Sequence, residues 1–185
     1  MPALISVLQN DVPQPVSTLN PVPVSARSYT SRVTSTRPAD TAAYLAGDVI
    51  GTATDATAAM EFTNIGPAGG RIAIADSDLR IDVAAIPVGM TSFKLHLYNA
   101  APVGVLADNA AWDLPDSDRA SYLGYIDLGS PVDLGSTLFV QSAGTATKQV
   151  QMGATSSLWG YLVTAGPYTP SNAAVKAVRL QSREV

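Results

Sequence analysis

The sequence has no cysteine among its 185 residues, which excludes disulfide bridges, thiolate metal sites and cysteine nucleophiles. Histidine occurs once, as His96, and glutamate only as Glu61 and Glu184. Long apolar runs are missing too, since no stretch approaches the ~20 residues that a membrane helix needs. The start, MPALISVLQN, lacks the basic segment of a signal peptide. We therefore expect a protein with no membrane partner that folds in a reducing cytoplasm.

Charge is also scarce, at 14% of residues against about 25% in a typical soluble domain. The net charge of −4 and the pI near 4.7 argue against nucleic-acid binding, which normally needs a basic face. A charge-poor surface suits a protein that is partly covered by partners, although small polar residues can also coat an exposed sheet. Arg27, Arg32 and Arg37 precede an acidic middle, from Asp40 to Asp133. These opposite charges could pair between subunits or could simply be solvated.

Residues 1–23 are rich in proline, which fixes φ and removes a hydrogen-bond donor, so we expect an extended or polyproline-like arm. A disordered tail is the alternative, but such tails usually avoid apolar runs like the one that begins at Leu4. We interpret the arm as lying on a neighbouring subunit, and residues 24–185 as a single domain. The expected interface residues are Leu4, Ile5, Val7, Leu8, Val12 and Val16 in the arm, and Arg27, Arg32 and Trp112 in the domain.

Short segments rich in β-branched and aromatic residues recur along the domain, separated by Gly and Pro turns, and helical periodicity is hard to find. This pattern predicts an all-β fold, namely an antiparallel β-sandwich or barrel, jelly-roll-like, with an extended N-terminal arm. The glycine-rich segment 66–70 is expected to be a hairpin connection. The predicted strands span residues 27–36, 44–50, 60–65, 71–75, 79–83, 93–98, 122–128, 137–141, 147–152, 158–164 and 173–181.

The stretch 93–128 holds a long turn-rich excursion between two of these strands, and we expect an ordered loop anchored by Trp112. The segment 114–120 is compatible with one helical turn that begins at Pro115. The loop also carries four aspartates. Aspartates dominate turns because they cap backbone N–H groups, which is the favoured interpretation, with a calcium site as the alternative. The aspartates are Asp108, Asp113, Asp116 and Asp118.

No catalytic motif is present. His96 lies on the side of its strand opposite Phe93, Leu95 and Leu97, so we expect it at a sheet surface or an interface. A Ser-His-Asp triad would need a nucleophile motif that the chain lacks. A glycosidase would need a carboxylate pair in an aromatic cleft, and aromatics are only 6% of residues. The sequence therefore predicts no enzyme, no cofactor and no resident metal.

Several blocks resemble small virion proteins of tailed bacteriophages, the head decoration or cement proteins. The blocks are FKLHLYNAAP (93–102), ADNAA (107–111), DRASYLGYI (118–126), GSTL (135–138) and LWGYLVT (158–164), with AYLAGDVIG (43–51) upstream. The resemblance covers roughly residues 44–169 and carries no catalytic residue. It implies a virion protein on the capsid surface that assembles in the host cytoplasm. Its implied partners are the major capsid protein and further copies of itself, with a trimer favoured.

A receptor- or carbohydrate-binding β-domain of a phage tail or neck is the alternative function. It would need an exposed aromatic platform, with Trp112 and Trp159 open to solvent beside a groove.

Overall fold

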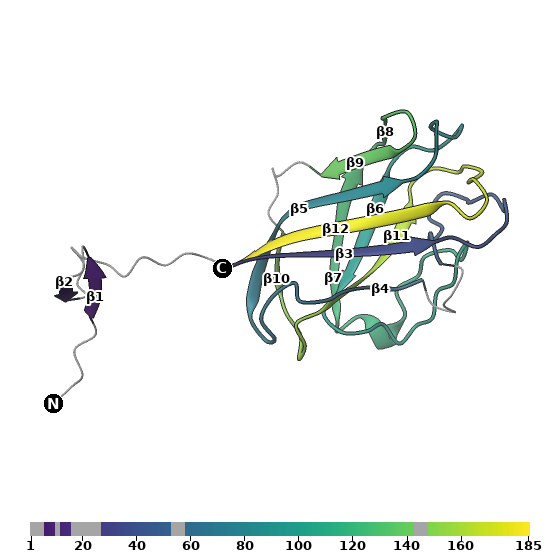
Figure 1. The fold of residues 1–185 in the computed structure, drawn as a ribbon. Helices are drawn as coiled ribbons and strands as arrows, with labels where there is room; N and C mark the ends of the chain where they lie inside the picture. Colours follow the sequence, from purple (N-terminus) through teal and green to yellow (C-terminus); the bar gives the residue numbers. More distant parts are fainter. Residues whose placement is uncertain (1–5, 10–11, 16–26, 53–57, 143–147) are drawn as a thin grey trace.

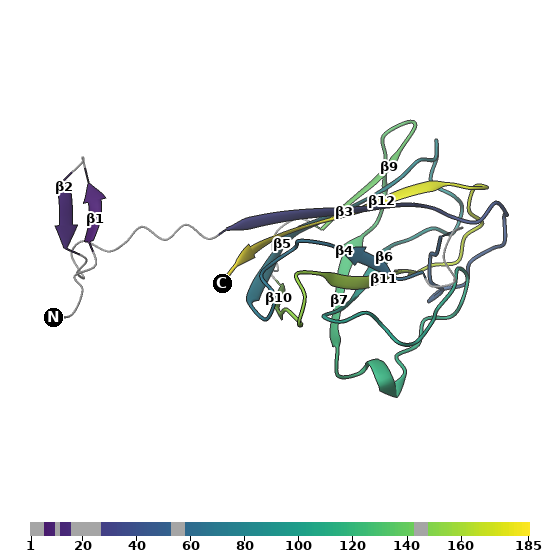
Figure 2. The same cartoon turned by 60° about the horizontal axis from the view of Figure 1, so that its bottom comes forward.

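The computed structural model describes residues 6–9, 12–15, 27–52, 58–142 and 148–185, and its body is a sandwich of two antiparallel sheets (Figures 1 and 2). This confirms the all-β prediction and selects the sandwich over the barrel. The strands are β1 (Ser6–Gln9), β2 (Val12–Pro15), β3 (Ser28–Thr36), β4 (Met60–Phe62), β5 (Arg71–Ile81), β6 (Phe93–Tyr98), β7 (Tyr122–Gly129), β8 (Val132–Asp133), β9 (Leu138–Ser142), β10 (Lys148–Gln151), β11 (Leu158–Thr164) and β12 (Val175–Glu184).

The order of the strands is that of a jelly roll. One sheet runs β3-β12-β5-β9-β8, with β10 beside β5, and the other runs β4-β11-β6-β7. When the short strands β8 and β10 are set aside, every connection from β3 to β12 crosses between the sheets except the one from β6 to β7. Two sheets wound in this way make a jelly roll, an architecture found in viral capsid proteins, lectins and cupins.

The core lies between the two sheets because successive side chains of a strand point to opposite faces. On β6, the residues Phe93, Leu95 and Leu97 point inward and are fully buried. Leu79 of β5 and Leu180 of β12 meet them from the six-stranded sheet. The alternate residues of β6 are largely buried as well, because a layer of loops covers the outside of the four-stranded sheet.

Three expectations were wrong in detail. The predicted break in the strand at 76–78 does not occur, since β5 continues through it and Arg179 of β12 binds both Asp76 and Asp78. The segment 44–50 forms isolated bridges and no strand, because its residues pair in turn with three different segments of the chain. The glycine-rich segment 66–70 leads from β4 into β5, which belong to different sheets, so it is no hairpin. No helix in the described part of the chain is long and apolar enough to span a membrane.

The described residues of the arm form a small antiparallel pair. Ser6 of β1 lies opposite Pro15 of β2, and Gln9 lies opposite Val12. Among the strands that the structure describes, these two pair only with each other. The described residues of the arm are extended, and an extended arm over all of residues 1–23 stays a prediction.

Candidate functional site

The outside of the four-stranded sheet is covered by residues 99–121, and residues 43–52, which bond to the edge of β11, join this segment; we call the two segments together the covering layer. Backbone hydrogen bonds join its two segments: Val49 N donates to Ala110 O (2.8 Å) and Trp112 N donates to Gly47 O (2.9 Å). A single 3-10 turn, η1 (Asp116–Asp118), lies within the second segment, with Pro115 as its N-cap. The expectation of an ordered loop with one helical turn is confirmed.

Trp112 anchors this layer, as predicted, by stacking on the sheet. Its ring lies 3.8 Å from the ring of His96, centroid to centroid, and 5.9 Å from that of Tyr122. His96 is buried, and its Nδ1 lies 2.9 Å from the Tyr122 hydroxyl, within hydrogen-bond distance. Burial and the nearby Lys94 lower the pKa of His96 to about 4. The histidine is therefore neutral at ordinary pH and forms part of the support for the layer.

The aspartates of the layer act separately. Asp118 is buried and accepts backbone hydrogen bonds from Val103 N (2.8 Å) and Gly104 N (2.9 Å), and Asp113 accepts one from Leu114 N (2.8 Å). This confirms the capping interpretation for both. Among the residues that the structure describes, no three His, Asp or Glu side chains gather in a way that could hold a metal ion.

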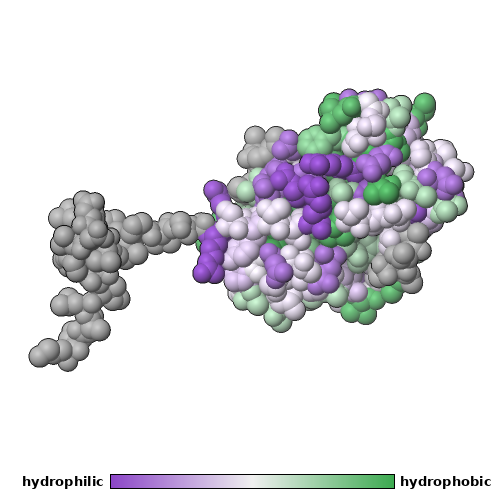
Figure 3. Space-filling view, in the orientation of Figure 1, coloured by the Kyte–Doolittle hydropathy of each residue, from purple (hydrophilic) through white to green (hydrophobic). Residues whose placement is uncertain are grey.

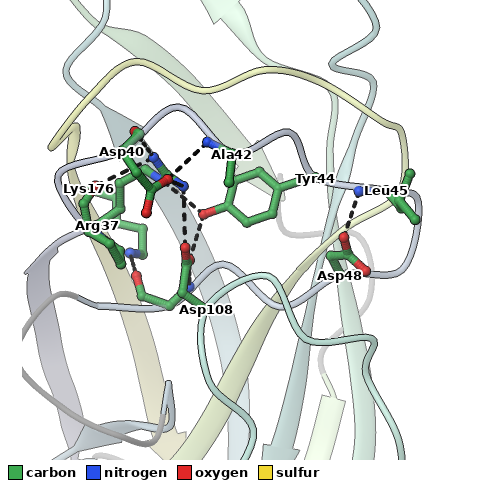
Figure 4. A network of polar contacts seen from close by, with 10 residues as sticks. Arg37, Asp40, Ala42, Tyr44, Leu45, Asp48, Asp108 and Lys176 are labelled. Atoms are coloured by element: carbon green, nitrogen blue, oxygen red, sulfur yellow. Dashed lines mark hydrogen bonds and ion pairs between the residues drawn. The ribbon is translucent and has the colours of Figure 1, made fainter.

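Asp108 belongs instead to a buried polar cluster, which Figure 4 shows. Its carboxylate accepts hydrogen bonds from the Tyr44 hydroxyl (2.6 Å) and from Gly51 N (2.6 Å), and it lies 3.3 Å from Nη2 of Arg37. The Arg37 side chain is only 2% exposed, and its Nε donates to the Tyr44 hydroxyl (3.0 Å). Asp40, half-exposed at the rim, pairs with Arg37 at 2.8 Å. The cluster thus ties the covering layer to the end of β3.

Lys176 of β12 completes the cluster. Its ammonium is buried and donates to the carbonyl oxygen of Gly51. Burial lowers the pKa of Lys176 to about 8, with Asp108 acting in the opposite direction. Arg37 thus pairs directly with the largely buried carboxylate of Asp108, and the same carboxylate favours the charged form of Lys176. Because the polar groups described here are bonded to one another, the cluster acts as an internal brace of the fold.

The outer face of the six-stranded sheet is open and polar, and Figure 3 shows it as a hydrophilic band across the body. Arg179 there pairs with Asp76 (2.8 Å) and Asp78, while its neighbour Arg32 on β3 is exposed. Arg80 on β5 lies over the ring of Phe139 at 5.7 Å. Part of the charge that could have paired between subunits therefore pairs within the chain.

The covering layer has the opposite character, because it holds aliphatic side chains out to solvent. Val103 is 73% exposed, Leu45 68% and Val105 66%. Single exposed aliphatics are ordinary on protein surfaces, but a set of them on one layer marks a candidate contact surface.

The structure separates the residues that the sequence assigned to an interface. Trp112 is half-buried in the covering layer, and Arg27 and Arg32 are exposed at and near the start of β3. Val7 and Leu8 lie in β1 and Val12 in β2. Leu4, Ile5 and Val16 lie outside the described residues. The buried cluster of Arg37, Tyr44, Asp108 and Lys176 was not foreseen.

Comparison with known proteins finds no matching family model and no matching curated protein. Similar solved structures include chains of virus particles. They include the acid-stable capsid of Helicobacter pylori bacteriophage KHP30 (10% identity, 86% of this chain and 90% of that chain, TM-score 0.28). They also include the heated particle of Israeli acute paralysis virus (12% identity, 100% of this chain and 85% of that chain, TM-score 0.30). A third is the Kashmir bee virus virion at neutral pH (14% identity, 85% of this chain and 70% of that chain, TM-score 0.27). These scores are too low to assign a function, and the jelly-roll assignment rests on the strand order.

Proposed function

We propose that this chain is a non-enzymatic structural protein of a virion, which binds the outside of a capsid as a decoration or cement protein and stabilises the shell. The observation that carries the proposal is the contrast between the two outer faces. The covering layer presents Leu45, Val103 and Val105 to solvent, whereas the opposite sheet face is polar. The resemblance of residues 44–169 to phage virion proteins supports the choice of partner.

The covering layer would face the major capsid protein. Full burial of a Val or Leu side chain contributes about 1.5–3 kcal/mol, so three of them supply a contact of modest strength. Repetition over a lattice, in a homo-oligomer for which a trimer is favoured, turns modest contacts into high avidity. A protein that binds only the assembled shell stabilises it by mass action. The chain would act at the capsid surface after assembly in the host cytoplasm.

Co-sedimentation with purified empty shells tests the proposal. A variant with Leu45→Ser, Val103→Ser and Val105→Ser is expected to keep its fold but to stay in the supernatant when the shells are pelleted. The matched control changes Val132→Ser and Leu134→Ser, which are similarly exposed at the edge of the other sheet, and should still bind. Equal binding by both variants would contradict a contact through the covering layer.

A recess of about 530 Å³ favours a second candidate, a carbohydrate- or receptor-binding domain. It is lined by Trp112, Tyr122 and Tyr125, and Tyr125 is 49% exposed. Trp159 lines a different groove, so the two tryptophans form no common platform. Binding to a glycan array that is lost in Tyr125→Ala would favour this function, and absence of binding would oppose it.

A further inference from the structure

The strand β3 forms an edge of the six-stranded sheet, and it differs from the other outer strands that the structure describes. β3 has nine residues and pairs with β12 without a register shift. Of the others, β4 has three residues and β8 has two, while β7 pairs with β6 through two irregularities. Proteins usually shorten, bulge or cover an edge, because a long regular edge is a template for another strand.

The register shows which backbone groups of β3 face outward. Hydrogen bonds from Glu184 N to Arg27 O (3.0 Å) and from Arg37 N to Ala174 O (3.1 Å) flank the strand. In an antiparallel pair, every second residue exchanges such bonds with its partner. The odd-numbered residues of β3 therefore bond to β12, and the N–H and C=O groups of the even-numbered residues point to the free edge. These residues are Ser28, Thr30, Arg32, Thr34 and Thr36, and all five are exposed.

A groove of about 680 Å³ runs beside this edge, between β3 and β4. Val33, Met60, Pro102 and Trp159 contribute to its lining, which is neutral apart from Glu61. Strand addition uses both features: main-chain hydrogen bonds to the edge give affinity, and alternate side chains of the added strand enter a pocket.

We propose that the edge of β3 accepts the N-terminal arm of a second copy of this chain, through β1. The arm's chemistry fits, because residues 4–9 (LISVLQ) carry no charge and four of the six are apolar, and the groove mixes apolar and neutral polar residues with the single charge of Glu61. β1 pairs on one side with β2 and can present its other side. β2 is the poorer donor, because Pro13 and Pro15 lack N–H groups.

Among the described strands, the two arm strands pair with each other and none pairs with the outer side of β3, which leaves that edge available to another molecule. Residues 16–26 are long enough to bridge at most about 36 Å, which suffices to reach a neighbour in an assembly. This inference deepens the proposed function by giving the arm a docking site on a neighbouring copy. It rests on that function, because the proposed oligomer on the shell is what brings the copies together.

Cysteine cross-linking tests the docking directly, because the natural chain has no cysteine to interfere. Full-length protein carrying Val7→Cys or Leu8→Cys is mixed with full-length protein carrying Thr30→Cys or Thr34→Cys, and a short thiol cross-linker is added. We expect a cross-linked heterodimer whose linked peptides join the arm to β3. Gln141→Cys, an exposed position on β9, is the matched control acceptor and should give none. The proposal would be overturned if the heterodimer formed neither in solution nor on shells. It would also be overturned if, in a chain that carries both cysteines, the cross-link formed only within that chain.

Proline substitution supplies an independent test. Thr34→Pro removes an outward N–H and leaves the bonds to β12 intact, whereas Thr34→Ala retains that N–H. The proline variant should keep the melting temperature of the alanine variant to within a few degrees but lose at least tenfold in cross-linking yield. Equal yields would overturn the proposal. Shell co-sedimentation is measured separately, so that a chain that cross-links but does not pellet refutes the proposed function alone.

Discussion

The buried cluster makes the fold sensitive to the charge of Asp108. Asp108→Asn keeps the shape of the side chain but removes the carboxylate that pairs with the buried Arg37 and favours the charged form of the buried Lys176. Removing one partner from a buried ion pair costs about 3–5 kcal/mol when the other charge is left without compensation, and we expect about 3 kcal/mol here because Asp40 still pairs with Arg37. For a chain of this size, that loss corresponds to about 6–12 °C in melting temperature.

Urea denaturation followed by tryptophan fluorescence measures this loss. The matched control is Asp40→Asn, which removes the other carboxylate bound to Arg37, half-exposed at the rim, and should change stability little. Adding Lys176→Met to Asp108→Asn should recover at least about 1 kcal/mol, since one uncompensated cation is then gone. Equal and small losses for Asp108→Asn and Asp40→Asn would refute the account of the cluster as a buried brace.

Three further predictions concern pH and backbone strain. His96 has its pKa lowered to about 4 from an ordinary 6.5, so the unfolded chain binds more protons between these values. The free energy of unfolding should therefore fall as pH drops from 6.5 to 5. The fall should be less than ~1.4 kcal/mol per pH unit, because the recess beside His96 is open on one side. In urea melts, His96→Gln should flatten this dependence on pH. The pKa of Lys176 is lowered to about 8 from an ordinary 10.5, so the free energy of unfolding should rise between pH 8 and 10 by up to ~1.4 kcal/mol per pH unit. A Lys176→Met variant that kept this rise would contradict the assignment. Gly89→Ala should cost about 3 kcal/mol or more in thermal melts, because its φ is +89° and a Cβ would lie 2.2 Å from the Pro167 carbonyl oxygen. Gly47→Ala, with φ +93° and open space, should cost only about 1 kcal/mol, and equal losses would show that the close approach does not matter.

The fold class was predictable because strands carry their signal locally. Alternation of apolar and polar residues and the Gly and Pro turns located most strands of the sandwich, and Trp112, the one tryptophan of its loop, marked the anchor of the covering layer. The continuous strand β5 was missed because Asp76 and Asp78 resemble a turn when read alone. Their neutralisation by Arg179 comes from a strand far along the chain.

The buried cluster left only one trace in the sequence. Lys176 shares a side of β12 with Val178 and Leu180, so a lysine stands on an otherwise apolar face. Its partners, Arg37 and Asp108, come from a strand end and a loop that only the jelly-roll winding brings together. Long-range polar pairing of this kind has no period, so pattern reading along the chain cannot find it.

The central claim, that this chain works by covering and stabilising a capsid, is tested most directly by heating purified empty shells with and without saturating protein. At a concentration one hundred times its Kd, the bound protein should stabilise each site by about 2.7 kcal/mol, so the shells should disrupt at a higher temperature and the protein should pellet with them. An unchanged disruption temperature, with all of the protein left in the supernatant, would contradict the claim.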